Sequence, residues 1–319
     1  MPSNCYRSAN AVAALAYALL AAGCAQSGSL PVTQQVARSP LARGAGWLSP
    51  GNKKCKNTLY VSSYRLNYVS IYCTKGHNQA PIGKITDGIS GPEGASVDGK
   101  GSLYVTNTTA GTVTEYSRNS LTPSFTYSAG LGNPAGVAVD RDRNVYVTSL
   151  SPASVEVFPQ ASNTPTIKIV GLTYPIDVAV DKSANLYVTT YTSSFKNGEI
   201  FVYAHGSAQG RNLGILTLAP GGIVLDKAGN IVTADQRLPG VLVFPPGQTS
   251  PSTTFAGNTL DPDPVRLDRA EKHAYVGDSV GNAVYVYGYP NGKLVDTITD
   301  GIDGPNGLAL DPPAPLYSN

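Results

Sequence analysis

The sequence predicts an all-β fold, a six-bladed β-propeller with four antiparallel strands in each blade. Six times an apolar run ends in an aspartate that is followed at once by a second strand-like run, as in VAVDRDRNVYV and IVLDKAGNIVT. Successive aspartates are separated by 42, 41, 45, 42 and 43 residues, which is the length of one four-stranded unit. These anchor aspartates are Asp98, Asp140, Asp181, Asp226, Asp268 and Asp311.

Each unit divides into four short runs that are rich in β-branched residues and tyrosine. In the second unit they are GASVD, SLYVTN, GTVTEYS and PSFTYS. A four-stranded sheet of this size cannot bury both faces alone, so neighbouring sheets must pack face to face. Radial packing in a ring also protects the strand edges. The 34 glycines, 24 prolines and 19 tyrosines agree with short strands and tight turns.

The two ends of the repeat predict how the ring closes. The first unit begins at TLYV, a second-strand run, and lacks an innermost strand of its own. The segment Gly307–Asp311 supplies one, so we expect the C-terminal strand to pair into the N-terminal blade. The terminal PLYSN resembles TLYVSS and could compete for the same place, which leaves the role of residues 312–319 open.

Cys55 and Cys73 flank the hairpin-like segment NTLYVSSYRLNYVSIY. They would lie across neighbouring strands, so we predict a disulfide in a compartment that permits one. Two unpaired buried thiols are the alternative, and the spacing of a zinc site is absent.

The first 23 residues predict a secretory signal peptide, with Arg7 followed by the apolar stretch Ala11–Gly23. LLAAGC resembles the bacterial lipobox, in which the cysteine becomes the lipid-modified first residue, here Cys24. Cleavage by an ordinary signal peptidase is the alternative. Both predict export, either to the bacterial cell envelope through a lipid anchor or to the extracellular space. Residues 24–54 then form a flexible tether and residues 55–319 the propeller.

The anchor aspartates are interpreted as structural residues. An aspartate at the end of a strand accepts hydrogen bonds from the backbone of the turn that follows it. A catalytic aspartate in every blade would be redundant. The recurrent tyrosine of the LYV runs is expected to pack between sheets.

The runs GVAVDRDRNVYV and SLYVTNTTAGTVTEY resemble the NHL and YVTN families of β-propeller repeats, over about residues 57–311. These families include extracellular binding and scaffold proteins as well as enzymes. GPNGLALD also resembles a segment of the gluconolactonase and regucalcin group, six-bladed propellers with a metal in the central channel. That resemblance implies Asn306 and Glu93 as metal ligands, although the glutamate here stands in PEG rather than EGP order.

A functional site in a repeat array should lie where the blades differ. The residues five positions before the six anchors are Glu93, Ala135, Ile176, Gly221, Asp263 and Asn306. All should begin an innermost strand at one mouth of the channel, and the three polar ones come from consecutive blades. The second strands end at the same mouth, where Asn107 and Asp278 fall on the polar side. Oxygen ligands of this kind suit Ca²⁺ or Mg²⁺, and a solvated rim is the alternative.

Other catalytic patterns are missing from the sequence. His77, His205 and His273 are expected at the opposite strand ends, as surface residues. No GxSxG elbow or Walker-type loop occurs. The formal net charge of +2 provides no basic stripe for nucleic acid.

The leading hypothesis is therefore a non-enzymatic, envelope-anchored module, a monomer that binds an envelope protein, a peptide or a glycan. It would meet the membrane through its lipid anchor only. The alternative is a metal-dependent, lactonase-like hydrolase or lyase with its site at the channel mouth.

Overall fold

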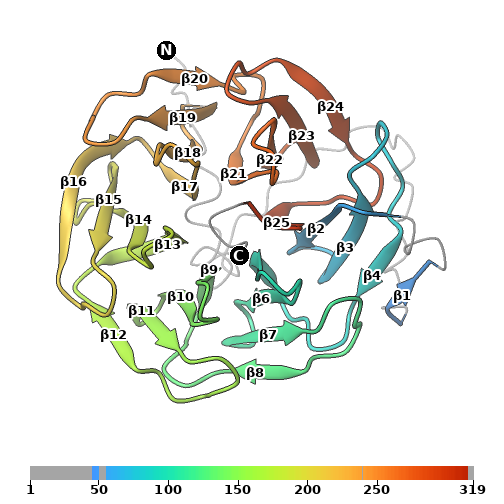
Figure 1. Ribbon diagram of the computed structural model, residues 1–319, viewed down its shortest axis with the longest axis horizontal. Coiled ribbons are helices and arrows are strands. Elements are labelled where there is room, and N and C mark those ends of the chain that lie inside the picture. The colour runs from blue at the N-terminus through green and yellow to red at the C-terminus, as the bar shows by residue number, and fades with distance from the viewer. Residues whose placement is uncertain (1–44, 50–54, 239, 315–319) are drawn as a thin grey trace, which may run out of the picture. The chain divides into compact units, whose positions relative to one another are not determined.

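The computed structural model describes residues 45–49, 55–238 and 240–314, which all lie in the compact unit Gly44–Asn319. The signal sequence, Cys24 and most of the predicted tether fall outside the described residues. In the described part every regular element is a β-strand, and no helix long and apolar enough to cross a membrane is found there. The strands form six antiparallel sheets arranged radially around a centre, which confirms the six-bladed propeller (Figure 1).

Five blades are four-stranded and are built from consecutive strands. From the centre outward the first two are β5 (Pro92–Val97), β6 (Leu103–Asn107), β7 (Thr112–Tyr116) and β8 (Phe125–Tyr127), then β9 (Pro134–Val139), β10 (Val145–Leu150), β11 (Ala153–Phe158) and β12 (Ile167–Val170). The third and fourth are β13 (Thr173–Val180), β14 (Leu186–Tyr191), β15 (Gly198–Tyr203) and β16 (Gly210–Thr217), then β17 (Pro220–Leu225), β18 (Ile231–Asp235), β19 (Gly240–Phe244) and β20 (Thr253–Phe255). The fifth is β21 (Pro262–Leu267), β22 (His273–Asp278), β23 (Ala283–Gly288) and β24 (Leu294–Ile298).

The closing blade combines both ends of the described chain, as the sequence predicts. From the centre outward it contains β25 (Pro305–Asp311), β2 (Thr58–Ser63), β3 (Tyr68–Cys73), β4 (Gly83–Ile85) and β1 (Trp47–Leu48). In the register of β2 and β25, Thr58 lies opposite Asp311. β1 adds a fifth strand at the outer edge, so the sheet includes part of the segment predicted to be a tether. Residues 315–319, which are the competing PLYSN run, lie outside the described residues.

A disulfide joins Cys55 to Cys73 at one end of this blade, with 5.6 Å between their Cα atoms. Cys73 ends β3 and lies opposite Thr58 at the start of β2. The bond that the sequence predicts therefore ties the segment entering β2 to the neighbouring strand. It holds the N-terminal contribution to the closing blade in place.

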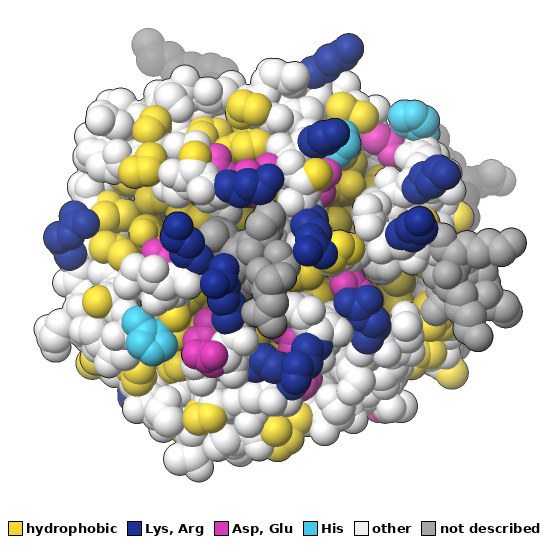
Figure 2. Space-filling view, in the orientation of Figure 1, with side chains coloured by type: hydrophobic (Ala, Val, Ile, Leu, Met, Phe, Trp, Pro, Cys, Tyr) yellow, Lys and Arg dark blue, Asp and Glu magenta, His cyan; other side chains and the backbone are white. Residues whose placement is uncertain are grey.

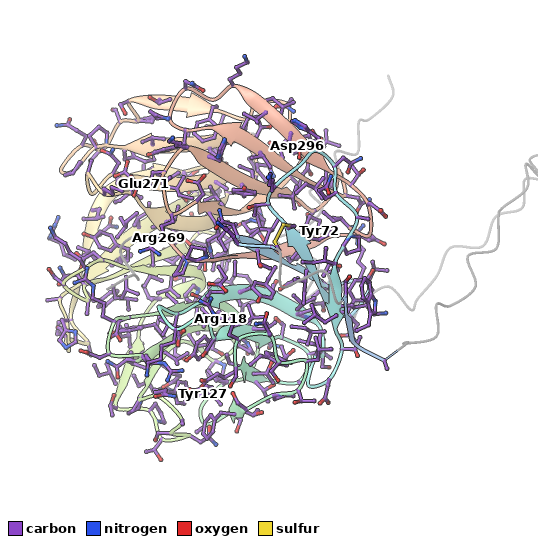
Figure 3. All side chains as sticks on the ribbon, turned by 45° about the vertical axis from the view of Figure 1, so that its right-hand side comes forward. Tyr72, Arg118, Tyr127, Arg269, Glu271 and Asp296 are labelled. Atoms are coloured by element: carbon purple, nitrogen blue, oxygen red, sulfur yellow. A yellow bond between two sulfur atoms is a disulfide. The ribbon has the colours of Figure 1, made fainter. Side chains whose placement is uncertain are left out.

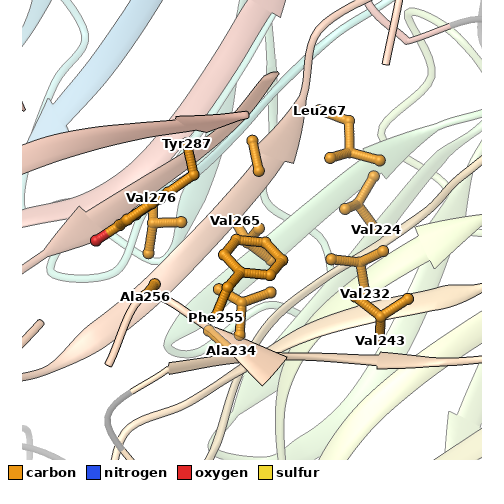
Figure 4. Close-up of a cluster of buried hydrophobic side chains, with 12 residues drawn as sticks. Val224, Val232, Ala234, Val243, Phe255, Ala256, Val265, Leu267, Val276 and Tyr287 are labelled. Carbon is orange, nitrogen blue, oxygen red and sulfur yellow. The ribbon is translucent and has the colours of Figure 1, made fainter. Parts of the chain in front are cut away.

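The core lies between adjacent blades. Figure 4 shows one such layer, where Val224, Val232 and Val243 of one blade pack with Val265 and Val276 of the next. Alternate residues of each strand face this layer, because side chains of a strand point to opposite sides. Tyr60, Tyr104, Tyr146 and Tyr275 are buried as expected, each 5% exposed or less, whereas Tyr187 of the third blade is partly exposed.

Each innermost strand runs from one face of the ring to the other, so its two ends define the two faces. Each of these strands carries a proline at or near its start, and this end belongs to what we call the entry face. Each ends at or just before an anchor aspartate, and this end belongs to the anchor face. The prolines are Pro92, Pro134, Pro175, Pro220, Pro262 and Pro305.

The anchor aspartates support turns in five blades. Asp140 is representative, because its carboxylate accepts hydrogen bonds from the backbone and side-chain amides of Asn144, each at 2.8 Å. Asp98, Asp181, Asp226 and Asp268 accept equivalent backbone bonds. Asp311 differs from the prediction. The other anchors accept bonds from amides two or four positions on, and at these positions after Asp311 stand Pro313 and Pro315, which have no amide hydrogen; the Asp311 carboxylate accepts a bond of 2.8 Å from Arg118.

Candidate binding site at the channel mouth

The structure places Glu93, Asp263 and Asn306 at the entry face, each as the second residue of an innermost strand. All three side chains are partly exposed. Glu93 accepts a hydrogen bond of 2.6 Å from the hydroxyl of Thr108. The strands that carry these residues, β21, β25 and β5, are consecutive around the ring (Figure 1). The predicted polar side of the mouth is therefore present.

Asn107 and Asp278 lie at the same face but point into the backbone instead of the channel. Both are fully buried. The Asn107 side-chain oxygen accepts a bond from the amide of Ser90 at 2.9 Å. Asp278 accepts bonds from the amides of Leu260 and Gly281, at 2.8 and 2.7 Å. These two residues hold the turns that lead into and out of their blades, and the structure does not bring them to the acidic mouth.

Two charged residues in the channel were missed by counting five positions back from each anchor. The residues four positions before the six anchors are Gly94, Gly136, Asp177, Gly222, Pro264 and Gly307. The residues two positions before the anchors are Ser96, Ala138, Ala179, Val224, Arg266 and Ala309. Asp177 and Arg266 are thus the exceptions at positions that are otherwise small or apolar. The same comparison of repeats, extended along the whole innermost strand, would have found both.

Glycine at the fourth position has a steric cause. A Cβ atom on Gly94 would overlap the carbonyl oxygen of Ala135 on the next innermost strand, and one on Gly307 would overlap that of Glu93. Neighbouring innermost strands therefore approach too closely for a side chain there. Asp177 occupies this position on β13, whose register with β14 shifts twice before Val178.

Arg266 spans the channel and joins three alternate blades. Its guanidinium donates to the Asp177 carboxylate on β13 at 3.1 Å and to the carbonyl oxygen of Ala95 on β5 at 3.3 Å. The side chains of Arg266 and Asp177 are only 14% and 9% exposed. Asp177 also accepts a bond from the amide of Ile223 at 3.0 Å. This ion pair is well enclosed and fixes the centre of the ring.

The mouth carries more negative than positive charge. Burial raises the pKa of Asp263 well above its usual value, and the nearby carboxylates of Asp261, Glu93 and Asp177 raise it further, against the lowering effect of Arg266. Burial also raises the pKa of Glu93, opposed by the Thr108 hydroxyl and reinforced by Asp177. Arg266 is the cation that acts on Asp263, and Arg237 acts on the neighbouring Tyr191. The site favours a positively charged group.

Unpaired polar atoms gather at this face. The second carboxylate oxygen of Asp177 and the hydroxyl of Tyr191 are buried and have no hydrogen-bond partner in the described structure. Tyr191 lies in a cluster of aromatic rings with Tyr174 and Phe195, with ring centres 6.1 to 6.3 Å apart. Buried polar groups are normally paired, so these atoms mark a place where a ligand or water can bind.

Below the ion pair the channel narrows to a cavity of about 30 Å³, lined by apolar residues of the innermost strands and by Arg266. Pro313 and Ala314 lie against this cavity from the anchor side and are buried. The volume holds one or two waters at most. A larger group can therefore interact at the entry mouth but cannot pass through.

The described residues contain no group of three His, Cys, Asp or Glu side chains placed to hold a metal ion. The proposed Ca²⁺ or Mg²⁺ site, and with it the lactonase-like alternative, gains no support from this geometry. The three histidines lie at the anchor face, as predicted. His273 contacts Asp268 at 2.7 Å and His77 contacts Asp296 at 3.5 Å, in both cases away from the mouth.

Large apolar side chains are exposed around the entry mouth. Among the described residues, eleven large hydrophobic side chains are exposed, and six of them lie in the turns of the entry face. These six are Tyr64, Phe195, Leu218, Leu238, Leu260 and Val280. The turns of the anchor face contribute none of the eleven. Apolar surface gathered on one face is typical of a protein-binding surface.

Comparison with known proteins identifies the fold. No family model matches the chain, and no curated protein matches its sequence. A propeller in a nidogen/laminin complex is similar in structure, with 18% identity over 80% of this chain and 98% of that chain and a TM-score of 0.66. Hydrazine synthase from Kuenenia stuttgartiensis is similar with 16% identity, over 82% of this chain and 87% of that chain, and a TM-score of 0.59. A protein of unknown function from Bacteroides caccae has 12% identity, over 80% of this chain and 98% of that chain, and a TM-score of 0.62. At these identities the likeness shows a shared β-propeller fold alone.

Proposed function

We propose that this propeller is an exported, non-enzymatic binding module that holds a protein partner against its entry face. The six-bladed β-propeller fold supports a binding or scaffold role in general. The observation that carries the finer proposal is the gathering of exposed apolar side chains around the acidic mouth. Apolar contact area with a few charged groups at its centre is a common composition for such interfaces.

The charge of the mouth selects the partner's chemistry. Glu93 and Asp263 are partly exposed and crowded by other carboxylates, with Arg266 as their cationic neighbour. A lysine or arginine side chain entering the mouth would relieve this repulsion. The unpaired oxygen of Asp177 and the hydroxyl of Tyr191 lie at the same end of the channel and could accept further hydrogen bonds. We therefore propose a partner with a basic residue at the centre of its contact surface and apolar residues around it.

The N-terminal sequence supports a location in the bacterial cell envelope. The apolar stretch Ala11–Gly23 followed by Cys24 is the basis for proposing export and a lipid anchor. Mass spectrometry of the mature N-terminus would test this proposal. An acylated Cys24 supports it, and an unmodified N-terminus after a different cleavage position contradicts it.

Site-specific photo-crosslinking in cells tests the binding face. A benzoylphenylalanine placed at position 195, 238 or 260 should give the same discrete adduct, because all three positions surround the mouth. A probe at position 294 or 295, exposed on β24 away from these turns, is the control. The adduct at position 260 should disappear when Asp263→Lys places a positive charge in the mouth. An adduct from the control positions only, or one indifferent to Asp263→Lys, would overturn the proposal.

A further inference from the structure

The anchor face carries a concentration of positive charge that the binding site at the entry face does not explain. Ten exposed lysine and arginine side chains lie in its turns and in the segment entering β2. They are Lys56, Lys75, Lys100, Arg118, Arg141, Lys182, Lys227, Arg269, Lys272 and Lys293. Asp142 is the one exposed acid in the same described turns. The view in Figure 2 is onto this face, and dark blue side chains surround its centre.

The repeat itself produces this charge. In five blades a basic residue follows the anchor aspartate by one or two positions, as at Lys100, Lys182 and Arg269. The anchor carboxylates offset part of this charge, as in the pair of Arg118 and Asp311, but they lie buried or half-buried beneath the turns and accept hydrogen bonds from them, so cations dominate the exposed layer. Figure 3 shows Arg118, Arg269 and Glu271 on neighbouring parts of this side of the ring. The cations therefore project outward while their negative neighbours face inward.

The arrangement of the charges indicates the shape of the partner. They come from all the blades and are spread over two dimensions, and no single groove follows them. Pro313 and Ala314 lie against the channel cavity on this side, and a separate hollow of about 760 Å³ between the fifth and the closing blade is lined by only three of the ten cations, Lys56, Lys75 and Arg269. Large exposed apolar side chains are also missing from its described turns. Because the cations are spread over the whole face and are not gathered in this hollow, the surface fits a sheet of anionic groups better than a single chain or a small molecule.

We propose that the anchor face lies on a membrane surface and binds the phosphates of anionic lipid headgroups. Basic side chains near an anionic bilayer contribute roughly a factor of five each to the partition coefficient. A polybasic surface adds electrostatic attraction to the membrane affinity that a lipid anchor supplies. The membrane would then be contacted by protein as well as by lipid. The entry face would point away from the bilayer, toward its partner.

The biological setting of this inference rests on the proposed envelope anchor, but its test does not. Vesicle sedimentation would use the full chain with Cys24→Ser, which cannot be acylated. Vesicles of phosphatidylcholine with phosphatidylglycerol are compared with pure phosphatidylcholine, and the latter measures any binding by the N-terminal apolar stretch. Binding should require phosphatidylglycerol and should weaken as salt shortens the range of the charges.

Matched charge reversals identify the face. The triple variant Lys100→Glu, Lys182→Glu and Arg269→Glu should lower the partition coefficient at least about a hundredfold, from three factors of five. The control is Arg65→Glu, Lys196→Glu and Arg237→Glu, three exposed cations in the entry-face turns with the same change in net charge. It should bind vesicles nearly as the parent does. Equal losses in both variants would show that net charge alone matters and would overturn the proposal.

A soluble polyanion provides the competing explanation. If a single-stranded oligonucleotide or heparin bound more tightly than the vesicles and depended on the same three residues, the face would be a polyanion site and the membrane proposal would fail. Failure with vesicles would leave the crosslinking result at the entry face unchanged, because that experiment uses different residues and a different partner.

Discussion

The two faces of this propeller differ in how fully their polar groups are paired. Six buried side-chain atoms of the described structure have no hydrogen-bond partner, and five lie at or near the entry-side ends of strands. They belong to Ser62, Ser63, Asp177, Tyr191 and Thr217. On the anchor face, five aspartates accept the amides of their own turns. The buried carboxylates of the anchor face are therefore occupied by backbone amides, whereas most of the unpaired buried polar atoms lie toward the entry face.

The same contrast appears in the charges and in the apolar surface. The net charge is only +2, but the exposed cations are unevenly distributed: ten lie on the anchor face and three lie on the entry face. Crowded carboxylates and exposed apolar side chains lie on the entry face. Residues that recur in every repeat stabilise the turns of the anchor face. Residues that differ between repeats, such as Glu93 and Asp263, lie at the mouth.

Removing the arginine that spans the channel should have the largest effect. Arg266→Met should lower the free energy of unfolding by about 3–5 kcal/mol, because it leaves Asp177 buried without its counter-ion. Urea denaturation measures this change. Arg269→Met, on the exposed anchor face, should change stability by less than about 0.5 kcal/mol.

Adding Asp177→Asn to Arg266→Met should recover part of the loss, since the buried charge is then removed. If Arg266→Met unfolds at the same urea concentration as the parent, the ion pair does not hold the ring together. That result would also remove the reason for describing the mouth as a carboxylate cluster balanced by one arginine.

The fold could be predicted from the sequence because its determinants recur. The spacing of the anchors and the alternation within the strands recur in successive repeats. The first unit lacks an innermost strand, and the last unit supplies one. The disulfide could be predicted for the same reason, since Cys55 and Cys73 flank one hairpin. Even so, Asp311 departed from its five counterparts, because Pro313 and Pro315 stand at the positions whose amides donate to the other anchors, and proline has no amide hydrogen.

The site could be predicted only in part. Glu93 and Asp263 were found because their position in the repeat places them at the mouth. Asn107 and Asp278 share that end of the blade, but whether such a side chain points into the channel or accepts backbone amides depends on turn geometry that their spacing does not reveal. The pairing of Asp177 with Arg266 crosses the ring between residues 89 positions apart, which no single repeat contains.

Two anchor aspartates with different partners distinguish the contribution of turn hydrogen bonds from that of a surface ion pair. Asp140 accepts bonds from its turn, and Asp311 pairs with Arg118. Asp140→Ala should cost about 1–3 kcal/mol, because it leaves the amides of Asn144 and the hydroxyl of Tyr146 without their acceptor. Asp311→Ala should cost less than about 1 kcal/mol. Burial raises the pKa of Asp311, and its partner Arg118 is half exposed and can turn to water.

Thermal and urea unfolding of the two variants provide the comparison, with both measured near neutral pH. Equal losses would mean that the anchors contribute through charge or packing common to all blades. A larger loss for Asp140→Ala supports the interpretation that the turn amides are what each anchor stabilises.

The smallest effect should be a gain in stability at the entry face. Asp263→Asn removes one carboxylate from a crowded mouth, and we expect the free energy of unfolding to rise by about 1 kcal/mol at neutral pH. The pKa of Asp263 is raised in the folded state, so its ionised form is less favourable there than in the unfolded chain. The free-energy cost of ionising Asp263 in the folded state is absent at pH values below its pKa in the unfolded chain. It grows as the pH rises toward the pKa in the folded state and is complete above that pKa. The difference in the free energy of unfolding between Asp263→Asn and the parent should therefore be small near pH 4 and increase toward pH 7.

The matched control is Asp142→Asn, which removes an exposed carboxylate among the cations of the anchor face and should show no such gain. If Asp263→Asn gained nothing at any pH, the carboxylates of the mouth would not repel one another, and a basic partner residue would have no crowding to relieve.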